Sequence, residues 1–290
     1  MTVIRARVLG FCLGVRRAVE MAEGEALRKG GGVYTMGPLI HNPQALASLR
    51  NRGIRILEEE SLPPDLAGAT VIIRAHGVSP GLEDELLNRR AVLVDATCPR
   101  VKKNQLKARS LAESGFSLFI AGEKRHGEVV GLTGYAPGAL VVSNFDEAAA
   151  AAAALRLKDP AAKTALVGQT TISGGEYRVI SGAIAAVFPD LEIVDSICPA
   201  TRERQEALEE LCSRVDGVIV AGGRASSNTR RLVDIARSRG KPAWLVESAG
   251  EFIREKGAAA LSGCRILGLS AGASTPDSDI AGLESLLEGL

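Results

Sequence analysis

The feature of this 290-residue sequence that most constrains its fold is an internal repeat. Residues 94–128 align with residues 194–228 at an offset of 100 positions without a gap, and a weaker copy opens the chain. Each copy contains a cysteine, a helix-like stretch, a strand-like run and, shortly after that run, a polar residue. The cysteines are Cys12, Cys98 and Cys198, and the polar residues are His41, His126 and Ser226. Self-similarity of this kind indicates one structural unit used three times.

The apolar pattern within each copy predicts strands that alternate with helices. Val15, Ala18 and Ala22 recur at helical spacing. Short apolar runs are typical of buried strands, and they occur at residues 71–73, 92–94, 118–120 and 218–220. Alternating strands and helices indicate βαβ units with parallel sheets.

We therefore predict an α/β fold of three small, pseudo-threefold-related domains with parallel sheets, although length alone suggests two larger domains. The first two copies end in a helix that leads into the next cysteine, whereas nothing follows the last helix, at 277–290. The otherwise unused strand at 3–9 is expected to complete the third domain. The predicted domains are residues 13–97, residues 98–197, and residues 198–290 together with the N-terminal strand in 1–12; the first two end in helices expected at 82–90 and 176–188.

The repeated cysteines are candidates for a metal site. Proline follows two of them and suits the first position of a helix, so Cys98 and Cys198 are expected at helix N-termini, where the metal-binding thiolate is favoured. Three domains around one axis would direct these thiols and Cys12 at a common centre. Three thiolates suit an iron–sulfur cluster or zinc and leave one metal position open, as in a catalytic centre. The alternative is a set of buried core cysteines, which we expect for Cys212 and Cys264.

Polar side chains at the ends of predicted strands form a second candidate group. Ligands of open α/β sheets bind beyond the carboxyl ends of the strands, and free N–H groups at helix N-termini favour anions. The predicted anion site includes the three histidines of the chain and five hydroxyl or amide residues: His41, His76, His126, Thr170, Ser226, Ser227, Asn228 and Ser270. Such residues are also common N-caps. For Thr171 and Ser274 the N-cap interpretation and the anion-site interpretation carry equal weight.

Glu128 is the only carboxylate among these positions. Desolvated near a metal and His126, it can hold a proton and act as a general acid. The alternative interpretation is a first-turn glutamate that the helix dipole favours.

Composition excludes several classes of function. The net charge is +1, from 35 Lys and Arg against 34 Asp and Glu, which argues against a nucleic-acid or anionic-membrane binder that relies on bulk electrostatics. Apolar runs are too short to span a bilayer. The first residues lack a signal-peptide pattern, so the five cysteines are expected to be thiols in a reducing cytoplasm. Neither a P-loop nor a dinucleotide fingerprint is present.

At the residues singled out above, the chain resembles the LytB-type 4-hydroxy-3-methylbut-2-enyl diphosphate reductases, iron–sulfur oxidoreductases of the non-mevalonate isoprenoid pathway. As an ordered set covering nearly the whole chain, the matching segments are highly specific. They are residues 10–15, 37–42, 74–77, 95–99, 124–128, 168–171, 226–228 and 271–276. The chain departs from the family pattern at Ala225 and at Asn104-Gln105.

The resemblance implies a [4Fe–4S] cluster held by three cysteine ligands per chain at the centre of the three domains: Cys12, Cys98 and Cys198. The implied reaction is the last step of the pathway, in which the open iron takes the substrate hydroxyl and reductive dehydroxylation gives isopentenyl and dimethylallyl diphosphate. Protons would be relayed through Glu128 with Thr170, beside His126. The diphosphate would be held by His41, His76, His126, Ser226, Asn228 and Ser270, with Ser227 and Thr170 close by.

The resemblance also implies the partners. They are the small allylic diphosphate and a separate one-electron donor protein of ferredoxin or flavodoxin type, with no nucleic acid and no membrane. Two other classes of function use the same residues. A zinc hydrolase would use the three cysteines and let Glu128 activate water. A non-catalytic iron–sulfur sensor would keep the cysteines and not need Glu128.

Overall fold

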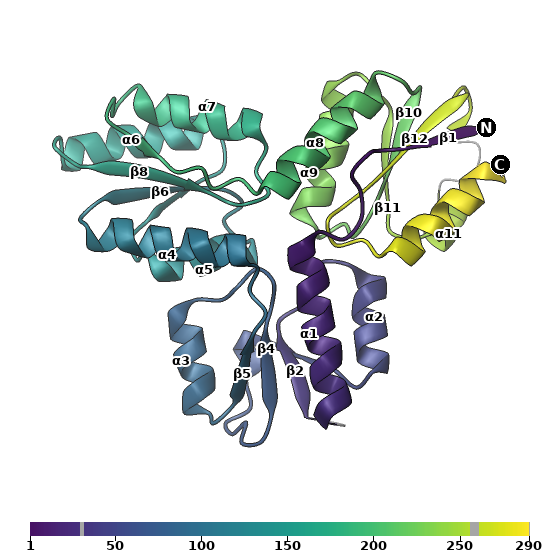
Figure 1. Ribbon diagram of the computed structural model, residues 1–290. Helices are drawn as coiled ribbons and strands as arrows, with labels where there is room; N and C mark the ends of the chain where they lie inside the picture. Colours follow the sequence, from purple (N-terminus) through teal and green to yellow (C-terminus); the bar gives the residue numbers. More distant parts are fainter. Residues whose placement is uncertain (30–31, 256–260, 290) are drawn as a thin grey trace. The chain divides into compact units, whose positions relative to one another are not determined.

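The computed structural model describes residues 1–29, 32–255 and 261–289, and these residues form three four-stranded, fully parallel sheets (Figure 1). Sheet B has the order β3-β2-β4-β5. Its strands are β2 (Val33–Met36), β3 (Arg55–Leu57), β4 (Thr70–Ile73) and β5 (Val92–Asp95). The helical segments of this part of the chain are α1 (Leu13–Lys29), α2 (Pro43–Asn51), the short 3₁₀ turn η1 (Glu59–Ser61) and α3 (Pro80–Asn88).

Sheet C repeats the same arrangement with the order β7-β6-β8-β9. Its strands are β6 (Ser117–Ala121), β7 (Leu140–Val142), β8 (Thr164–Gly168) and β9 (Glu192–Ile193). The helices between them are α4 (Pro99–Glu113), α5 (Gly127–Tyr135), α6 (Phe145–Lys158) and α7 (Gly174–Ala185).

Sheet A has the order β1-β12-β10-β11. Taken from the other edge, this is the same arrangement, with the N-terminal strand β1 in the position that β5 and β9 occupy in sheets B and C. Its strands are β1 (Thr2–Arg5), β10 (Gly217–Ala221), β11 (Ala243–Val246) and β12 (Ile266–Ala271), and its helices are α8 (Pro199–Cys212), α9 (Ser227–Ser238), α10 (Ala249–Glu255) and α11 (Asp277–Glu288). Strand β1 pairs in parallel with β12, with Thr2 opposite Ile266. The N-terminal strand therefore completes sheet A as β5 and β9 complete the other two sheets. Three parallel-sheet units confirm the predicted fold class.

Contacts divide the chain into two compact units. The first unit holds sheet A and the second holds sheets B and C. Their residues are Met1–Glu23, Pro38–Gly53 and Pro199–Leu290 for the first, and Gly24–Gly37 and Ile54–Cys198 for the second. The boundaries 13–97, 98–197 and 198–290 with 1–12 stay a proposal based on the repeat.

Several element ends differ from the sequence expectations, and local capping explains two of them. Helix α7 begins at Gly174, two residues before the predicted start, because the Ser173 hydroxyl accepts from Glu176 N–H and the Glu176 carboxylate accepts from Ser173 N–H. Helix α3 likewise begins at Pro80 behind the cap Ser79. Strand β1 ends at Arg5, well short of the expected residue 9. Helix α11 ends at Glu288, and Leu290, the last residue of that prediction, lies outside the described residues.

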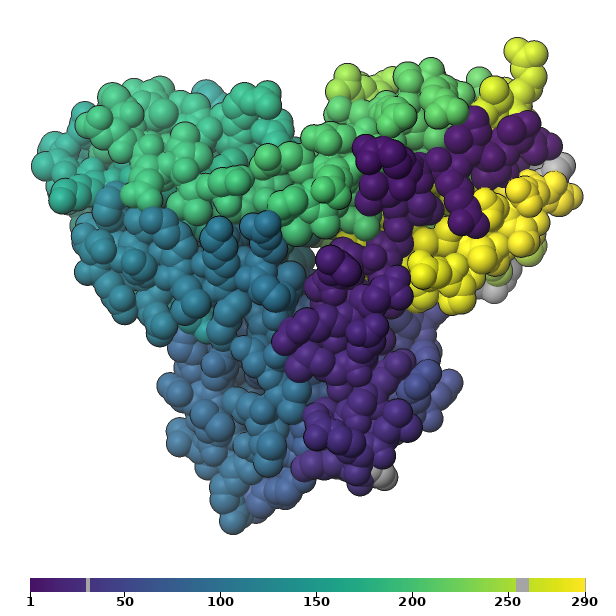
Figure 2. All heavy atoms as spheres, in the orientation of Figure 1, coloured from purple at the N-terminus to yellow at the C-terminus, as the bar shows by residue number. Residues whose placement is uncertain are grey.

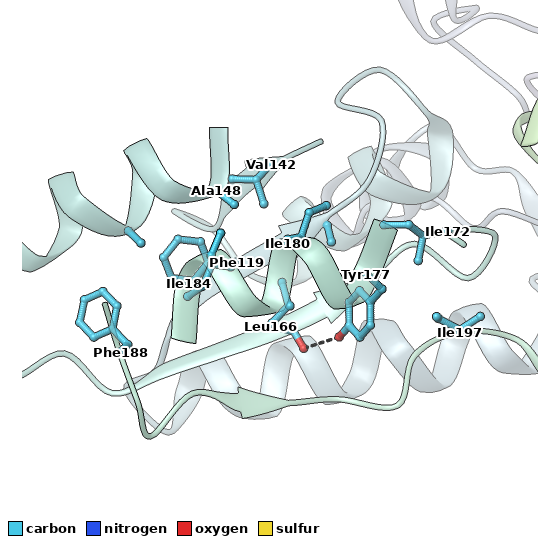
Figure 3. Packing of buried hydrophobic residues seen from close by; sticks show 13 residues of the cluster. Phe119, Val142, Ala148, Leu166, Ile172, Tyr177, Ile180, Ile184, Phe188 and Ile197 are labelled. Carbon is cyan, nitrogen blue, oxygen red and sulfur yellow. Dashed lines mark hydrogen bonds between the residues drawn. The ribbon is translucent and has the colours of Figure 1, made fainter. Parts of the chain in front are cut away.

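The sheets are buried between their own helices. In sheet C, Phe119 and Leu166 of the central strands are inaccessible to solvent and pack against Tyr177, Ile180 and Ile184 of α7 (Figure 3). The Tyr177 hydroxyl donates towards the Leu166 and Val194 carbonyls, at 2.9 and 2.8 Å. The buried apolar area is the main favourable term for such a layer.

In the first unit, the N-terminal strand packs against the C-terminal helix. Val3 and Leu9 contact a buried cluster that includes Ile280 and Leu283 of α11. Figure 2 shows the N-terminal residues in purple next to the yellow helix. Arg5 also pairs with Glu284 of that helix. These contacts fix the segment that leads to Cys12.

Candidate functional site

Each repeated cysteine lies directly before a helix and is anchored through its backbone. Cys98 is the N-cap residue of α4, and Pro99 takes the first helical position as expected. Cys198 and Cys12 stand directly before α8 and α1. Each cysteine N–H donates to a carbonyl just beyond or at the end of the neighbouring strand, namely Ala273 for Cys12 (3.2 Å), Ala75 for Cys98 (3.0 Å) and Thr170 for Cys198 (3.0 Å). The repeat therefore places the three thiols in equivalent local positions.

The exposure of the cysteines separates the repeated thiols from a core thiol. Cys12, Cys98 and Cys198 form no disulfide and are partly exposed, whereas Cys212 is 2 % exposed, as expected for a core residue. Burial raises the pKa of the Cys212 thiol, which disfavours the metal-binding thiolate there. Cys264 was also expected to be structural, and it is partly exposed before β12. Partly exposed thiols at helix N-termini are suitable ligands for a soft metal or an iron–sulfur cluster.

Glu128 lies at the centre of a buried hydrogen-bond network in the second unit. Its carboxylate is 1 % exposed and accepts two bonds from Thr170, one from the backbone N–H at 2.7 Å and one from the hydroxyl at 2.8 Å. The Glu128 N–H donates to Nδ1 of His126 at 3.2 Å, so His126 caps α5. The predicted proton-handling residues are thus joined, from the ends of β6 and β8.

The two histidines of the second unit lie against each other. His76 and His126 make an edge-to-face contact with ring centroids 5.2 Å apart. Their backbones follow β4 and β6, so the fold brings together residues of two sheets. A Cβ on Gly127 would lie 2.8 Å from the buried Arg74 guanidinium, which shows why the residue after His126 has no side chain. Burial lowers the pKa of Arg74, more strongly than the charges of Glu59 and Glu58 raise it.

The first unit holds a second set of buried polar groups. Asn228, on the first turn of α9, is 4 % exposed, and neither atom of its amide group has a hydrogen-bond partner among the described residues. The Ser270 hydroxyl, in β12, is fully buried and equally without a partner there. Ser226 caps α9 by accepting from Thr229 N–H at 3.3 Å, and Ser227 bonds Arg231. Buried polar groups without partners are costly, so their presence indicates a polar ligand.

His41 is held through its backbone in the same unit. Its carbonyl accepts a hydrogen bond from the Ser274 hydroxyl at 3.2 Å and contacts Gly223 so closely that a Cβ there would clash. The next residue, Asn42, caps α2 by accepting from Ala45 N–H at 2.9 Å. The N-cap interpretation is wrong for Ser274, since it holds the His41 segment instead.

The cap of α7 is Ser173, so Thr171 is not an N-cap either. The Thr171 hydroxyl accepts from Gln169 Nε2 at 2.8 Å, and the side-chain Oε1 of Gln169 accepts from Glu123 N–H at 3.0 Å. Gln169 is fully buried and links the loop before His126 to the end of β8.

The prediction did not assign roles to Gln169 and Arg74, which position the site residues through long-range contacts. Arg74 and Gln169 belong to the same sequence motifs as His76 and Thr170. This closeness in sequence is the signal that could have indicated their role in positioning the site. Gln105, one of the departures from the family pattern, is fully buried and packs on Gly77 and Gly131.

The two compact units divide the predicted residues between them: Cys98, Cys198, His76, His126, Glu128 and Thr170 in the second, and Cys12, His41, Ser226, Ser227, Asn228 and Ser270 in the first.

These features define a class of repeated parallel α/β proteins that carry one accessible thiol for each sheet and polar side chains at the carboxyl ends of the strands. A family model described as LytB protein matches residues 3–288, and the chain belongs to the LytB family. No helix among the described residues combines the length and apolar character needed to cross a membrane.

Curated relatives match over the full length. A protein of Treponema denticola named 4-hydroxy-3-methylbut-2-enyl diphosphate reductase is 42% identical, with 100% of both chains covered. One of the same name from Anaeromyxobacter is 37% identical and covers 98% of this chain and 96% of its own. Among solved structures, a Plasmodium falciparum E-1-hydroxy-2-methyl-but-2-enyl-4-diphosphate reductase is similar with a TM-score of 0.90 and 29% identity, covering 99% of this chain and 87% of its own.

A second solved structure, of an (E)-4-hydroxy-3-methyl-but-2-enyl diphosphate reductase described as the terminal enzyme of the non-mevalonate pathway, has a TM-score of 0.68 and 35% identity, with both chains covered completely.

Proposed function

We propose that this chain catalyses the reaction for which its LytB relatives are named, the reduction of 4-hydroxy-3-methylbut-2-enyl diphosphate in the last step of the non-mevalonate pathway. The allylic C–O bond breaks, two electrons and two protons are consumed, and water leaves with formation of isopentenyl or dimethylallyl diphosphate. The observation that supports this most strongly is the family match over residues 3–288 together with equivalent, partly exposed thiols at all three repeats.

Cys12, Cys98 and Cys198 are the proposed ligands of a [4Fe–4S] cluster. The fit rests on their donor chemistry, because they are partly exposed thiols outside any disulfide, directly before helices. When bound, such a cluster supplies electrons one at a time and, with three protein ligands, one open metal position. The chain provides no further thiol in an equivalent position of the repeat, since Cys212 is buried in a helix.

Glu128 is the proposed proton donor, and Thr170 fixes its orientation. Both carboxylate oxygens bond Thr170, so the side chain is held in one position without an ordering step during the reaction. Burial at 1 % exposure excludes bulk water from this carboxyl group. A proton that leaves Glu128 then passes to a bound substrate, directly or through the Thr170 hydroxyl, which suits protonation of a leaving hydroxyl.

The proposed diphosphate ligands complement an anion. Asn228 and Ser270 bury polar groups that lack partners among the described residues, and phosphate oxygens would accept from both. His41, His76 and His126 can donate from their ring nitrogens, and Ser226 can donate from its hydroxyl. The helix N-terminus at Ser226 adds free N–H groups and a favourable dipole.

A separate protein of ferredoxin or flavodoxin type is the proposed electron donor. Five cysteines without a disulfide also favour a reducing compartment, and we propose the cytoplasm.

The test is metal and sulfide analysis of anaerobically purified protein, followed by substrate turnover with reduced methyl viologen. We expect about four iron and four sulfide per chain, a visible absorption band that bleaches on reduction, and formation of both products. Cys98→Ser is expected to lose cluster iron, while Cys264→Ser, at a partly exposed cysteine outside the repeat, keeps it. One zinc per chain without sulfide would instead support a hydrolase that uses Glu128 to activate water.

A further inference from the structure

The helix that follows Cys98 has a charge distribution unlike that of its counterparts in the repeat. Helix α4 carries five cations and one anion, Glu113, at its last position. Helix α8, at the same place after Cys198, carries two cations and four anions, and α1, after Cys12, carries four and three. The net charge of the whole chain is only +1, so the positive charge of α4 is a local concentration.

Helix stability does not account for these cations. A helix N-terminus favours anions, yet the first turn of α4 contains Arg100 and Lys102 and no acidic residue, and Lys103 follows directly. Lys102 is bound internally, to Asp95 at 3.2 Å, Glu83 at 3.4 Å and the Tyr135 hydroxyl at 3.2 Å. These contacts tie α4 to β5, α3 and α5 and thereby support the segment that bears Cys98.

The remaining cations face solvent. Arg100, Lys103 and Arg109 are exposed, and none of them has a carboxylate within 4.0 Å in the part of the chain that the structure describes. Lys107 pairs with Glu192 at 2.8 Å and keeps 42% of its side chain exposed. Leu106 lies between them on the same face and is 44% exposed. Arg109 also lies over the Tyr135 ring, 5.6 Å from its centroid. The exposed face of α4 is thus an apolar residue bordered by cations, of which Arg100, Lys103 and Arg109 have no carboxylate partner among the described residues.

We propose that this exposed face of α4 is the docking surface for an acidic one-electron donor protein, which delivers electrons next to Cys98. The inference rests on the proposed function, which needs two single-electron deliveries in each turnover. In each delivery the reduced centre of the donor loses one electron and the cluster gains one, without transfer of an atom. Cys98 is the N-cap of α4, and at about 1.5 Å rise per residue Lys103 lies within roughly 8 Å of it along the helix.

Charge complementarity selects the partner. Unpaired cations around a small apolar centre raise the association rate of an acidic partner and leave the complex weak enough to dissociate between two deliveries. Transient electron-transfer complexes typically bury small interfaces of this kind. Counted over their whole length, α8 carries a net charge of −2 and α1 of +1, against +4 for α4.

The experiment uses the cluster-loaded protein without substrate and an acidic plant-type [2Fe–2S] ferredoxin as the donor. The rate at which the cluster absorption bleaches after mixing is followed by stopped flow at several salt concentrations. For Lys103→Glu we expect the second-order rate constant to fall about tenfold at low salt, with a flatter salt dependence, because reversal of one charge at the rim of an interface acts mainly on association. Arg100→Glu is expected to act in the same direction.

Lys163→Glu is the matched control, because it makes the same charge change on an exposed residue before β8 and is expected to behave as the unchanged protein. Bleaching by dithionite and the iron content are expected to be equal in all four proteins. Equal rates of ferredoxin-driven bleaching in Lys103→Glu, Arg100→Glu and Lys163→Glu would overturn the proposal. A similar loss with dithionite would overturn it as well, since the cations would then act on the cluster itself.

Two further outcomes are distinguishable. If the two α4 variants abolish binding to vesicles of anionic phospholipid while ferredoxin-driven bleaching is unchanged, the face binds lipid and the proposal fails. If the cluster accepts electrons from ferredoxin in an α4-dependent way but the protein does not convert the diphosphate, the docking surface stands and the proposed function fails.

Discussion

Replacement of Glu128 by glutamine tests the assignment of the proton donor with the smallest change in shape. The carboxylate accepts from Thr170 N–H at 2.7 Å and from the Thr170 hydroxyl at 2.8 Å. In Glu128→Gln the amide oxygen can still accept from the backbone N–H. The amide nitrogen, however, can only donate, so the Thr170 hydroxyl must reverse its role and become the acceptor.

The expected cost to the fold is small, and the expected cost to turnover is large. Two hydrogen bonds lose their charge assistance, which corresponds to about 1 to 2 kcal/mol in the free energy of unfolding. Loss of a positioned acid lowers kcat by about 100-fold to 10,000-fold, or roughly 3 to 5 kcal/mol in the barrier. The assay is turnover with reduced methyl viologen, accompanied by iron content and chemical denaturation.

Glu176→Gln is the matched control. Glu176 is also a first-turn glutamate whose carboxylate bonds a backbone N–H, but it lies in the exposed capping box of α7. Glutamine is accepted in a capping box, so turnover and stability are expected to stay close to those of the unchanged protein. If Glu128→Gln retains its cluster and turns over as fast as Glu176→Gln, Glu128 is only a first-turn glutamate and the proposed mechanism is wrong; the sensor alternative then gains support.

Other substitutions separate binding from stability. Asn228→Ala removes a buried amide group that has no partner among the described residues, so the ligand-free protein is expected to lose no stability and the KM for the diphosphate to rise about tenfold; a stability loss above about 2 kcal/mol with an unchanged KM would contradict this. Phe119→Ala empties a fully buried position of sheet C and is expected to cost about 3 to 5 kcal/mol in denaturation; a cost below about 1 kcal/mol would refute the packing argument. Burial raises the pKa of Tyr177 to about 12, with Asp195 acting in the same direction and a hydrogen bond with Ser196 opposing it. Since an unfolded tyrosine ionises near pH 10, the free energy of unfolding is expected to be insensitive to this group below about pH 10 and to fall between pH 10 and 12. Tyr177→Phe is expected to cost about 1 kcal/mol at pH 8 and to lose this part of the pH dependence; an unchanged pH profile would show that another group causes it.

The fold class could be predicted from the sequence because its signals are local and repeated. The strand predicted at 118–120 lies within β6 (Ser117–Ala121), since consecutive apolar residues favour a fully buried parallel strand. Proline after Cys98 marked the start of α4 for an equally local reason, the fixed φ of the pyrrolidine ring. The placement of the N-terminal strand in the third sheet followed from counting, since one unit lacked a strand and one strand lacked a unit; its pairing with β12 came from the structure.

Element ends and helix caps could not be predicted as well. Ser274 and Thr171 are of residue types that are common at N-caps. The hydroxyl of Ser274 nevertheless donates to the His41 carbonyl, 233 positions away in sequence. A hydroxyl takes whichever partner the folded chain brings near, and a local pattern carries no information about that partner.

The sequence by itself determined the kind of unit, its number and the residue types that each unit places at the ends of its strands. Only the tertiary structure decided that Glu128 bonds Thr170 and that Gln169 links the loop before His126 to Thr171. It also decided that the Asn228 amide is buried with no partner in the described part of the chain. It likewise decided which cations of α4 are neutralised and which face solvent. The physical reason is range: periodicity and capping act over a few residues, whereas hydrogen bonds, desolvation and charge pairing depend on distances in space that packing alone sets.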